Sequence, residues 1–251
     1  MNNLIAISGN SGSGKSLVSC AIANEITRKY KKSVIVINPN KVTPMLPVYL
    51  PLQTFERNNS LGDLFFNGIS YQNLKGKLHI HSKNSNLAFM GYISTDNILR
   101  YNSDISKDEI SKLLNLLSDG SENAFCDYII VDCNSDVTGC NLSLFAINNA
   151  FANIKVISPD NNGVSYLTSQ EQFIQSPGAK NITVLNNCYD YSPVDVLKKE
   201  LNINITLPHC KSAYEHYLSG GNFHFNFNET SKEFTSSIEK IITSFLEVKN
   251  E

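Results

Sequence analysis

Short apolar runs alternate with segments of helical periodicity along most of this chain. Runs rich in Ile, Val and Leu lie at residues 4–8, 33–37, 78–81, 128–132, 154–158, 182–186 and 203–207, with a less regular one at 87–90. Apolar positions recur at helical spacing at residues 17–31, 60–66, 106–117 and about 230–248. Short apolar strands separated by helices are typical of a parallel sheet that is buried on both faces. We therefore predict an α/β fold, with a doubly wound, mostly parallel sheet and helices on both faces.

Residues at the boundaries of these segments refine the prediction. Ser60 and Ser106 precede helical segments and are expected to cap them. Residues 41–55 are rich in proline, so an ordered loop is expected there. The last predicted helix carries an apolar stripe at Phe234, Ile238, Ile241, Ile242 and Phe245. Such a stripe suits a membrane surface or the sheet, and its lack of a basic polar side favours packing on the sheet.

Length and charge narrow the class of protein. The 251 residues are enough for one large domain, and residues 1–251 show no repeat, linker or boundary that would divide them. The net charge of −2 does not favour a broad nucleic-acid surface, although contact at a specific site stays open. The six cysteines form no C-x-x-C pair, which favours free thiols in a reducing compartment. No signal peptide or apolar run of membrane-spanning length is found, so we expect a cytoplasmic protein without an integral membrane segment.

Residues 9–16 carry the most specific motif. They read GNSGSGKS and match the phosphate-binding pattern G-x-x-x-x-G-K-[ST] between a predicted strand and a predicted helix. Glycines allow the backbone to approach phosphates, Lys15 would reach the β- and γ-phosphates, and the Ser16 hydroxyl would bind Mg²⁺. The expected ligands are therefore ATP and Mg²⁺. The expected nucleotide-binding residues in this loop are Gly12, Ser13, Gly14, Lys15, Ser16 and Leu17.

Further landmarks extend the motif into a family resemblance. They lie at residues 11–16, 36–40, 126–132, 158–160, 184–187 and 207–209. Their order resembles the MinD/ParA family of P-loop ATPases over nearly the whole chain. The segment 60–64, with a helix before the strand at 128–132, looks most like the CpaE/TadZ branch, which is associated with localising pilus-assembly machinery.

The resemblance implies roles for single residues. Asp132 would hold the magnesium ion, because a hard cation prefers oxygen ligands. Asn186 looks like the family's adenine-contacting asparagine, whose amide can both donate and accept. Pro208 and His209 would lie beside the base.

Three positions depart from the family pattern. Asn10 replaces the signature lysine of the family's deviant phosphate loop, which in relatives reaches the partner's phosphates across a dimer. Asn38 and Asn40 replace aspartates, and Asn40 stands where the family orients the attacking water. An amide can hydrogen-bond water but cannot accept its proton. With Lys15 and Asn40 as the candidate catalytic residues, we expect nucleotide binding with weak or slow ATPase activity.

These features support one functional hypothesis and leave two alternatives open. The first is a nucleotide-dependent switch that positions or recruits a partner assembly, with ATP/ADP, an unidentified protein partner and a nucleotide-dependent homodimer as its expected interactions. It would be cytoplasmic, or peripheral at an assembly site. The alternatives are a non-catalytic scaffold with ATP as a structural ligand and a small-molecule P-loop kinase. His79 and His81, two apart on a predicted strand, would face the same side, but without a nearby third ligand in the sequence ordinary strand histidines are favoured over a metal site. The segment 219–228 fits either an edge strand or a partner-binding loop.

Overall fold

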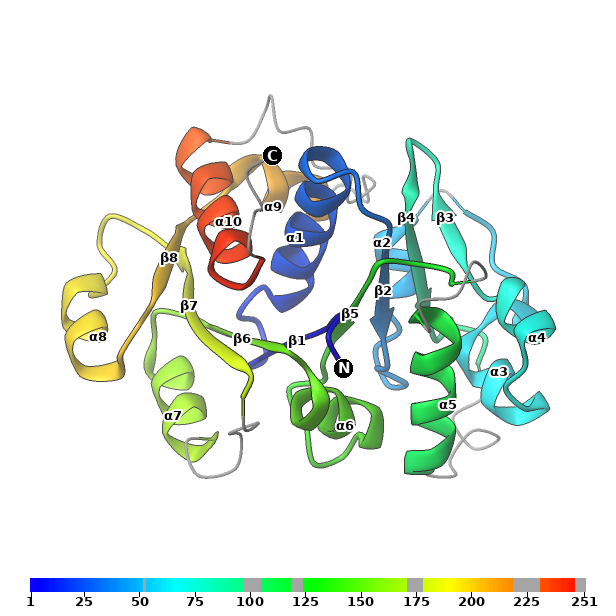
Figure 1. Cartoon of the computed structure of the whole chain (residues 1–251). Coiled ribbons are helices and arrows are strands. Elements are labelled where there is room, and N and C mark those ends of the chain that lie inside the picture. Colours follow the sequence, from blue (N-terminus) through cyan, green and yellow to red (C-terminus); the bar gives the residue numbers. More distant parts are fainter. Residues whose placement is uncertain (52, 97–104, 119–123, 171–177, 219–230, 247–251) are drawn as a thin grey trace.

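One eight-stranded sheet runs through the molecule (Figure 1). The computed structural model describes the chain except for residues 52, 97–104, 119–123, 171–177, 219–230 and 247–251, and the segment 219–228 falls outside the described residues. The strand order is β3-β4-β2-β5-β1-β6-β7-β8. The strands are β1 Leu4–Gly9, β2 Val34–Asn38, β3 His79–His81, β4 Asn84–Gly91, β5 Tyr128–Asp132, β6 Ala152–Ile157, β7 Lys180–Cys188 and β8 Ile205–Pro208. Among the described strands, only β3 and β4 pair in antiparallel fashion, which confirms the predicted α/β fold with a mostly parallel sheet.

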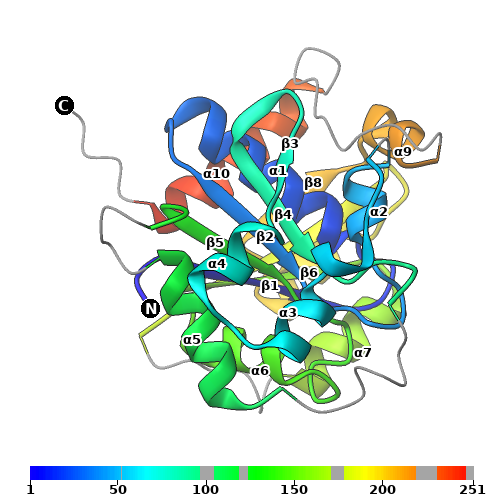
Figure 2. The same ribbon diagram turned by 90° about the vertical axis from the view of Figure 1, so that its right-hand side faces the viewer.

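Alternate side chains of the strands enter two separate cores. Ile5 and Ile7 of β1 face one core, whereas Leu4 and Ala6 face the other. The first core is covered by α1 (Lys15–Lys29) and α10 (Lys232–Phe245), and the second by α5 (Lys107–Ser118) and α6 (Asn141–Asn149). Figures 1 and 2 show these helices as layers on opposite sides of the sheet. The four apolar residues at the start of β1 are therefore buried on both faces of the sheet. A strand that is buried on both faces appears in the sequence as a continuous apolar run.

Both predicted serine caps are confirmed. Ser60 Oγ accepts a 3.0 Å hydrogen bond from the backbone N of Asp63 at the start of α3 (Leu61–Asn67). Ser106 Oγ accepts from the backbone N of Glu109, and the Glu109 carboxylate accepts from the backbone N and the hydroxyl of Ser106. This reciprocal arrangement is a capping box, which satisfies amide groups that the first helical turn leaves free.

The structure contains helical elements that the sequence pattern did not predict. The proline-rich segment 41–55 is not only a loop, because α2 (Leu46–Tyr49) forms within it with a proline in its first turn, where no amide donor is needed. The other unpredicted elements are η1 Arg57–Asn59, α4 Tyr71–Lys75, α6, α7 Asn161–Gln170, α8 Val194–Leu201 and α9 Lys211–Leu218. Most of these elements are short or have a weak apolar periodicity, whereas α8 is amphipathic but only eight residues long.

The apolar stripe of the last helix packs inward. Its five residues have exposed fractions of 4% or less, and they belong to the same core as α1. The prediction that this stripe packs on the sheet is confirmed, and a membrane-binding role for it is wrong. Among the described residues, none of the helices is both long and apolar enough to cross a membrane. Each of the six cysteines is a free thiol, and four of them are buried.

Candidate functional site

The glycine-rich loop connects β1 to α1 at the carboxyl edge of the sheet. Gly12 and Gly14 have φ angles of 76° and 83°, in the left-handed region that residues with a Cβ atom rarely adopt. A Cβ atom at Gly14 would also lie 2.4 Å from Nδ2 of Asn186. The glycines in this loop are therefore required by backbone conformation and by the close approach of β7.

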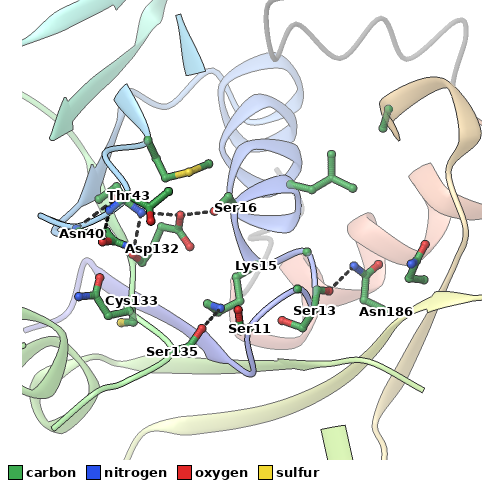
Figure 3. Close-up of a pocket in the computed structure, with 18 of the residues that line it drawn as sticks. Ser11, Ser13, Lys15, Ser16, Asn40, Thr43, Asp132, Cys133, Ser135 and Asn186 are labelled. Atoms are coloured by element: carbon green, nitrogen blue, oxygen red, sulfur yellow. Dashed lines mark hydrogen bonds between the residues drawn. The ribbon is translucent and has the colours of Figure 1, made fainter. Parts of the chain in front are cut away.

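A cavity of about 490 Å³ opens above this loop (Figure 3). Residues 11–17 line it from one side, the ends of β2 and β5 from a second, and residues of β7 and α9 from a third. Nearly all the candidate site residues meet here: Gly12, Ser13, Gly14, Lys15, Ser16, Leu17, Asn40, Asp132 and Asn186. Pro208 ends β8 and is not among the lining residues, although the neighbouring His209 and Cys210 are. The volume falls within the range of small-molecule sites.

Lys15 reaches over the loop with its ammonium group held by two oxygens. Its Nζ donates to the backbone O of Asn10 at 3.0 Å and to Oγ of Ser135 at 2.8 Å. Burial lowers the pKa of Lys15, and the negative charge of Asp132 opposes that shift. Lys15 is half-buried and contacts no carboxylate directly among the described residues, which favours an anionic ligand beside it.

Asp132 is the most constrained side chain in the cavity. It ends β5, is 1% exposed, and its Oδ2 accepts hydrogen bonds from three side chains. Ser16 Oγ donates at 2.6 Å, Asn38 Nδ2 at 2.9 Å, and the Tyr49 hydroxyl is the third donor. Its other oxygen, Oδ1, is buried without a hydrogen-bond partner among the described residues.

These residues fit a divalent cation. A buried carboxylate oxygen without a partner is costly unless a ligand satisfies it. Ser16 uses its proton on Asp132, which leaves the lone pairs of its oxygen for a cation. The structure thus brings the two predicted metal residues, 116 positions apart in the sequence, into direct contact. Ser16 and Asp132 would hold Mg²⁺, which would neutralise phosphate charge when bound.

Asn10 points inward rather than toward solvent. Its Oδ1 accepts from the backbone N of Ser158 at 3.1 Å, and its Nδ2 donates to Ser158 Oγ at 2.9 Å. Ser158 Oγ in turn donates to Asp160 at 2.7 Å. Both ends of the Asn10 amide are therefore engaged within this chain, and the phosphate loop is tied to the end of β6.

Asn40 lines the cavity but uses its side chain locally. Its Oδ1 accepts from the backbone N of Val42 at 3.0 Å and of Thr43 at 2.9 Å, which shapes the turn after β2 (Figure 3). The backbone N of Asn40 donates to Oδ1 of Asn38. The side-chain amides of Asn38 and Asn40 therefore hold the turn after β2 in place beside the cavity.

On the opposite side of the cavity, Asn186 supports the loop. Its Nδ2 donates to the backbone O of Ser13 at 2.7 Å, as Figure 3 shows. Next to it, Asn187 has a φ angle of 64° and its Oδ1 contacts Nδ1 of His209. The His209 ring stacks on Tyr189 at 4.4 Å between centroids and meets Tyr214 edge-on at 5.9 Å. His209 and Tyr214 line the cavity, so part of its wall is aromatic.

The histidines of β3 lie away from this cavity. His79 Nε2 is 2.9 Å from the backbone O of Asn59, and burial lowers the pKa of His79. Within the described part of the chain, no group of three or more His, Cys, Asp or Glu side chains is placed to hold a metal ion. Both histidines lie on β3, the edge strand of the sheet.

Three residues of the site were not predicted from the sequence. Ser135 holds Lys15, Ser158 holds Asn10, and Tyr49 contacts Asp132. Ser135 follows three residues after the strand-end carboxylate, which is a signal that could have indicated it. Ser158 likewise follows a strand and belongs to the landmark 158–160, although nothing local indicates Asn10 as its partner. Tyr49 has no such local signal, because only the tertiary structure brings it to Asp132.

Comparison with solved structures places this fold among known ones. A ParA family ATPase from Chlorobium tepidum TLS matches with a TM-score of 0.74 and 16% identity, over 96% of this chain and 99% of that chain. The septum site-determining protein MinD from Pyrococcus horikoshii OT3, complexed with Mg-ADP, has a TM-score of 0.71 and 14% identity, over 96% and 94% of the two chains. A chain of the MinC:MinD cell division protein complex from Aquifex aeolicus has a TM-score of 0.63 and 12% identity, over 98% and 99%.

These similarities establish a P-loop NTPase fold of the MinD/ParA type. No protein-family model matches the sequence, and no curated protein does. At such low identities the match defines the fold, and the chemistry must be argued from the site itself.

Proposed function

We propose that this chain binds ATP with Mg²⁺ and acts as a MinD/ParA-type switch that positions or recruits a partner assembly. The observation that carries the proposal is the contact between Ser16 and Asp132 below the phosphate loop. It joins the loop hydroxyl to a strand-end carboxylate, and P-loop NTPases hold their magnesium ion with this pair of groups. The MinD structure complexed with Mg-ADP supports the same choice of ligands.

We further propose that turnover is slow. Phosphoryl transfer depends on positioning and on electrostatic stabilisation, and Lys15 supplies a buried positive charge for both. Asn40 can orient a water molecule but cannot take its proton. The loop cation and the metal-binding pair therefore favour tight binding, whereas nothing in the amide pair Asn38 and Asn40 provides a base.

The nucleotide would act by favouring one conformation or a homodimer, which then engages a protein partner. A ligand shifts such an equilibrium only through contacts that differ between the two states. The MinC:MinD complex of Aquifex aeolicus is a structural relative with a protein partner, and we propose a partner of unknown identity for this chain. Within the family, the proposal extends to the CpaE/TadZ branch and to a cytoplasmic protein that gathers at an assembly site.

A scaffold with nucleotide as a structural ligand is the second candidate. Asn10 favours it, because both ends of its amide are used inside this chain and it offers no cation to a partner's phosphates. The two candidates differ in whether ATP hydrolysis and self-association respond to each other. ATPase rate and molecular mass, measured together with and without ATP, separate them.

Calorimetric titration of the purified protein with ATP and Mg²⁺ tests the nucleotide site. Lys15→Ala should weaken ATP binding by at least tenfold, because a charge-assisted contact contributes roughly 1.5–3 kcal/mol. Lys112→Ala, on the exposed side of α5 and outside the cavity, is the matched control and should bind ATP like the natural chain. Equal affinity of the Lys15 variant and the natural chain would refute the nucleotide site.

A further inference from the structure

Tyr49 is an unusual element of this cavity, because it comes from outside every phosphate-binding motif. It ends α2, the helical turn within the proline-rich segment after β2, and its side chain is fully buried. Its ring packs on Phe89 of β4 with centroids 5.0 Å apart and an interplanar angle of 31°. Its hydroxyl donates a hydrogen bond to Oδ2 of Asp132. Packing therefore determines where this hydroxyl lies.

The Tyr49 hydroxyl can act only as a donor toward Asp132. An ionised carboxylate has only acceptor sites, so the proton of this hydrogen bond belongs to the Tyr49 hydroxyl and points at Asp132. This makes it a charge-assisted hydrogen bond, the stronger class of such bonds.

The three donors distinguish the two oxygens of the Asp132 carboxylate. Ser16, Asn38 and Tyr49 all donate to Oδ2, and Oδ1 has no partner among the described residues. With Oδ2 held from three directions, the carboxyl group cannot rotate without breaking hydrogen bonds. Its orientation is therefore set before any ligand arrives, which is the function of groups that surround a metal ligand.

We propose that Tyr49 is a positioning residue for the metal site, which orients Asp132 so that Oδ1 is left for the divalent cation. The inference rests on the proposed Mg²⁺–nucleotide function. It also gives the segment after β2 a role, because Thr43 and Met45 line the cavity and Met45 accepts the backbone hydrogen bond of Tyr49 at 2.9 Å. The side chain of Tyr49 thereby connects the metal site to the part of the cavity wall that the segment after β2 forms.

Tyr49→Phe tests the proposal, because it keeps the ring on Phe89 and removes only the hydroxyl. The measured quantity is the affinity for a fluorescent ADP analogue, titrated once with Mg²⁺ and once with a chelator present. We expect the apparent Mg²⁺ affinity in the presence of the analogue to fall about tenfold, the lower end for losing a group that orients a metal ligand. The metal-free affinity for the analogue should stay within twofold of the natural chain.

Tyr128→Phe is the matched control. Tyr128 begins the same strand that Asp132 ends. Its ring is half-buried, and the centroids of the Tyr128 and Phe151 rings are 6.3 Å apart. Its variant should keep both affinities. As a second variant, Asn38→Ala removes another donor to Oδ2 and should reproduce the selective loss of Mg²⁺ affinity.

The outcomes separate this inference from the proposed function. If the natural chain does not bind the analogue with or without Mg²⁺, the proposed function fails. If the natural chain binds and Tyr49→Phe responds to Mg²⁺ in the same way, only the role of Tyr49 is overturned. If Tyr49→Phe loses affinity for the analogue without metal as well as apparent affinity for Mg²⁺, Tyr49 contributes to general stability. That result would also overturn the positioning role of Tyr49.

Discussion

Asn10 and Ser158 form two hydrogen bonds across 148 positions of sequence. The side-chain Oδ1 of Asn10 accepts from the backbone N of Ser158 at 3.1 Å, and Nδ2 of Asn10 donates to the Ser158 hydroxyl at 2.9 Å. The pair fastens the phosphate loop to the end of β6. The side chain of Asn10 is thus used for an intramolecular contact.

Replacing Asn10 with lysine should destabilise the protein. The lysine ammonium cannot accept the hydrogen bond from the Ser158 backbone, and position 10 is only 6% exposed. We expect a loss of about 1–3 kcal/mol in the free energy of unfolding, measured by urea denaturation without nucleotide. Asn10→Asp keeps an acceptor for the same backbone group and should lose less. A lysine variant as stable as the natural chain would show that the Ser158 contact contributes nothing.

Lys15→Met should remove nucleotide binding without lowering the stability of the ligand-free protein. Burial lowers the pKa of Lys15, so folding disfavours its charged form and the unfolded chain binds the proton more tightly. Burying the charged Lys15 therefore lowers the free energy of unfolding at neutral pH. This loss disappears as the pH rises from the lowered pKa of Lys15 in the folded protein to its ordinary pKa in the unfolded chain.

The melting temperature of Lys15→Met without nucleotide checks this prediction. It should be at least that of the natural chain near neutral pH, and the difference should shrink in alkaline buffer. A lower melting temperature near neutral pH would mean that the contacts of Lys15 with Asn10 and Ser135 outweigh its burial.

Asn40→Asp should accelerate ATP hydrolysis. Aspartate can keep the hydrogen bonds from Val42 and Thr43 with one oxygen, and its second oxygen can take a proton from water. We expect a rise of roughly tenfold in the single-turnover rate, at the modest end for an added general base. Asn187→Asp, an equal change in charge on the far wall of the cavity, serves as the control. An unchanged rate with ATP still bound would favour the scaffold.

Ser106→Ala should weaken the start of α5. The capping box gives the Glu109 carboxylate two donors, and the hydrogen bond from the Ser106 backbone, followed by that from its hydroxyl, lowers the pKa of Glu109. Removing the hydroxyl should cost about 1 kcal/mol of unfolding free energy near neutral pH.

The same variant has a defined pH dependence. An acid whose pKa is lowered by folding contributes stability above its unfolded pKa and loses it as the pH falls through the folded pKa. The difference in melting temperature between Ser106→Ala and the natural chain should therefore become smaller in acidic buffer. Ser111→Ala, in the middle of the same helix, should be neutral or slightly stabilising. An equal loss at both serines would contradict the capping role.

The sequence by itself determined the features that depend on neighbours along the chain. Buried strands, the phosphate loop between β1 and α1, the serine caps and the inward stripe of α10 all follow from local periodicity or from turn chemistry. Asp132 was recognisable because it ends an apolar run. The helix α2 escaped prediction because its four residues are too few to produce a regular pattern.

Only the tertiary structure decided what the polar side chains of the site do. The strand order places β2 beside β5, β5 beside β1, and β6 between β1 and β7, and residues 83 to 173 positions apart in the sequence come into contact. Asn10 turns to Ser158, Asn186 supports Ser13, Pro208 lies outside the cavity lining, and Tyr49 reaches Asp132. A local pattern specifies which segments are strands but not which strands are neighbours, so these contacts have no signal in the sequence. Their geometry decides how the loop and the carboxylate are held.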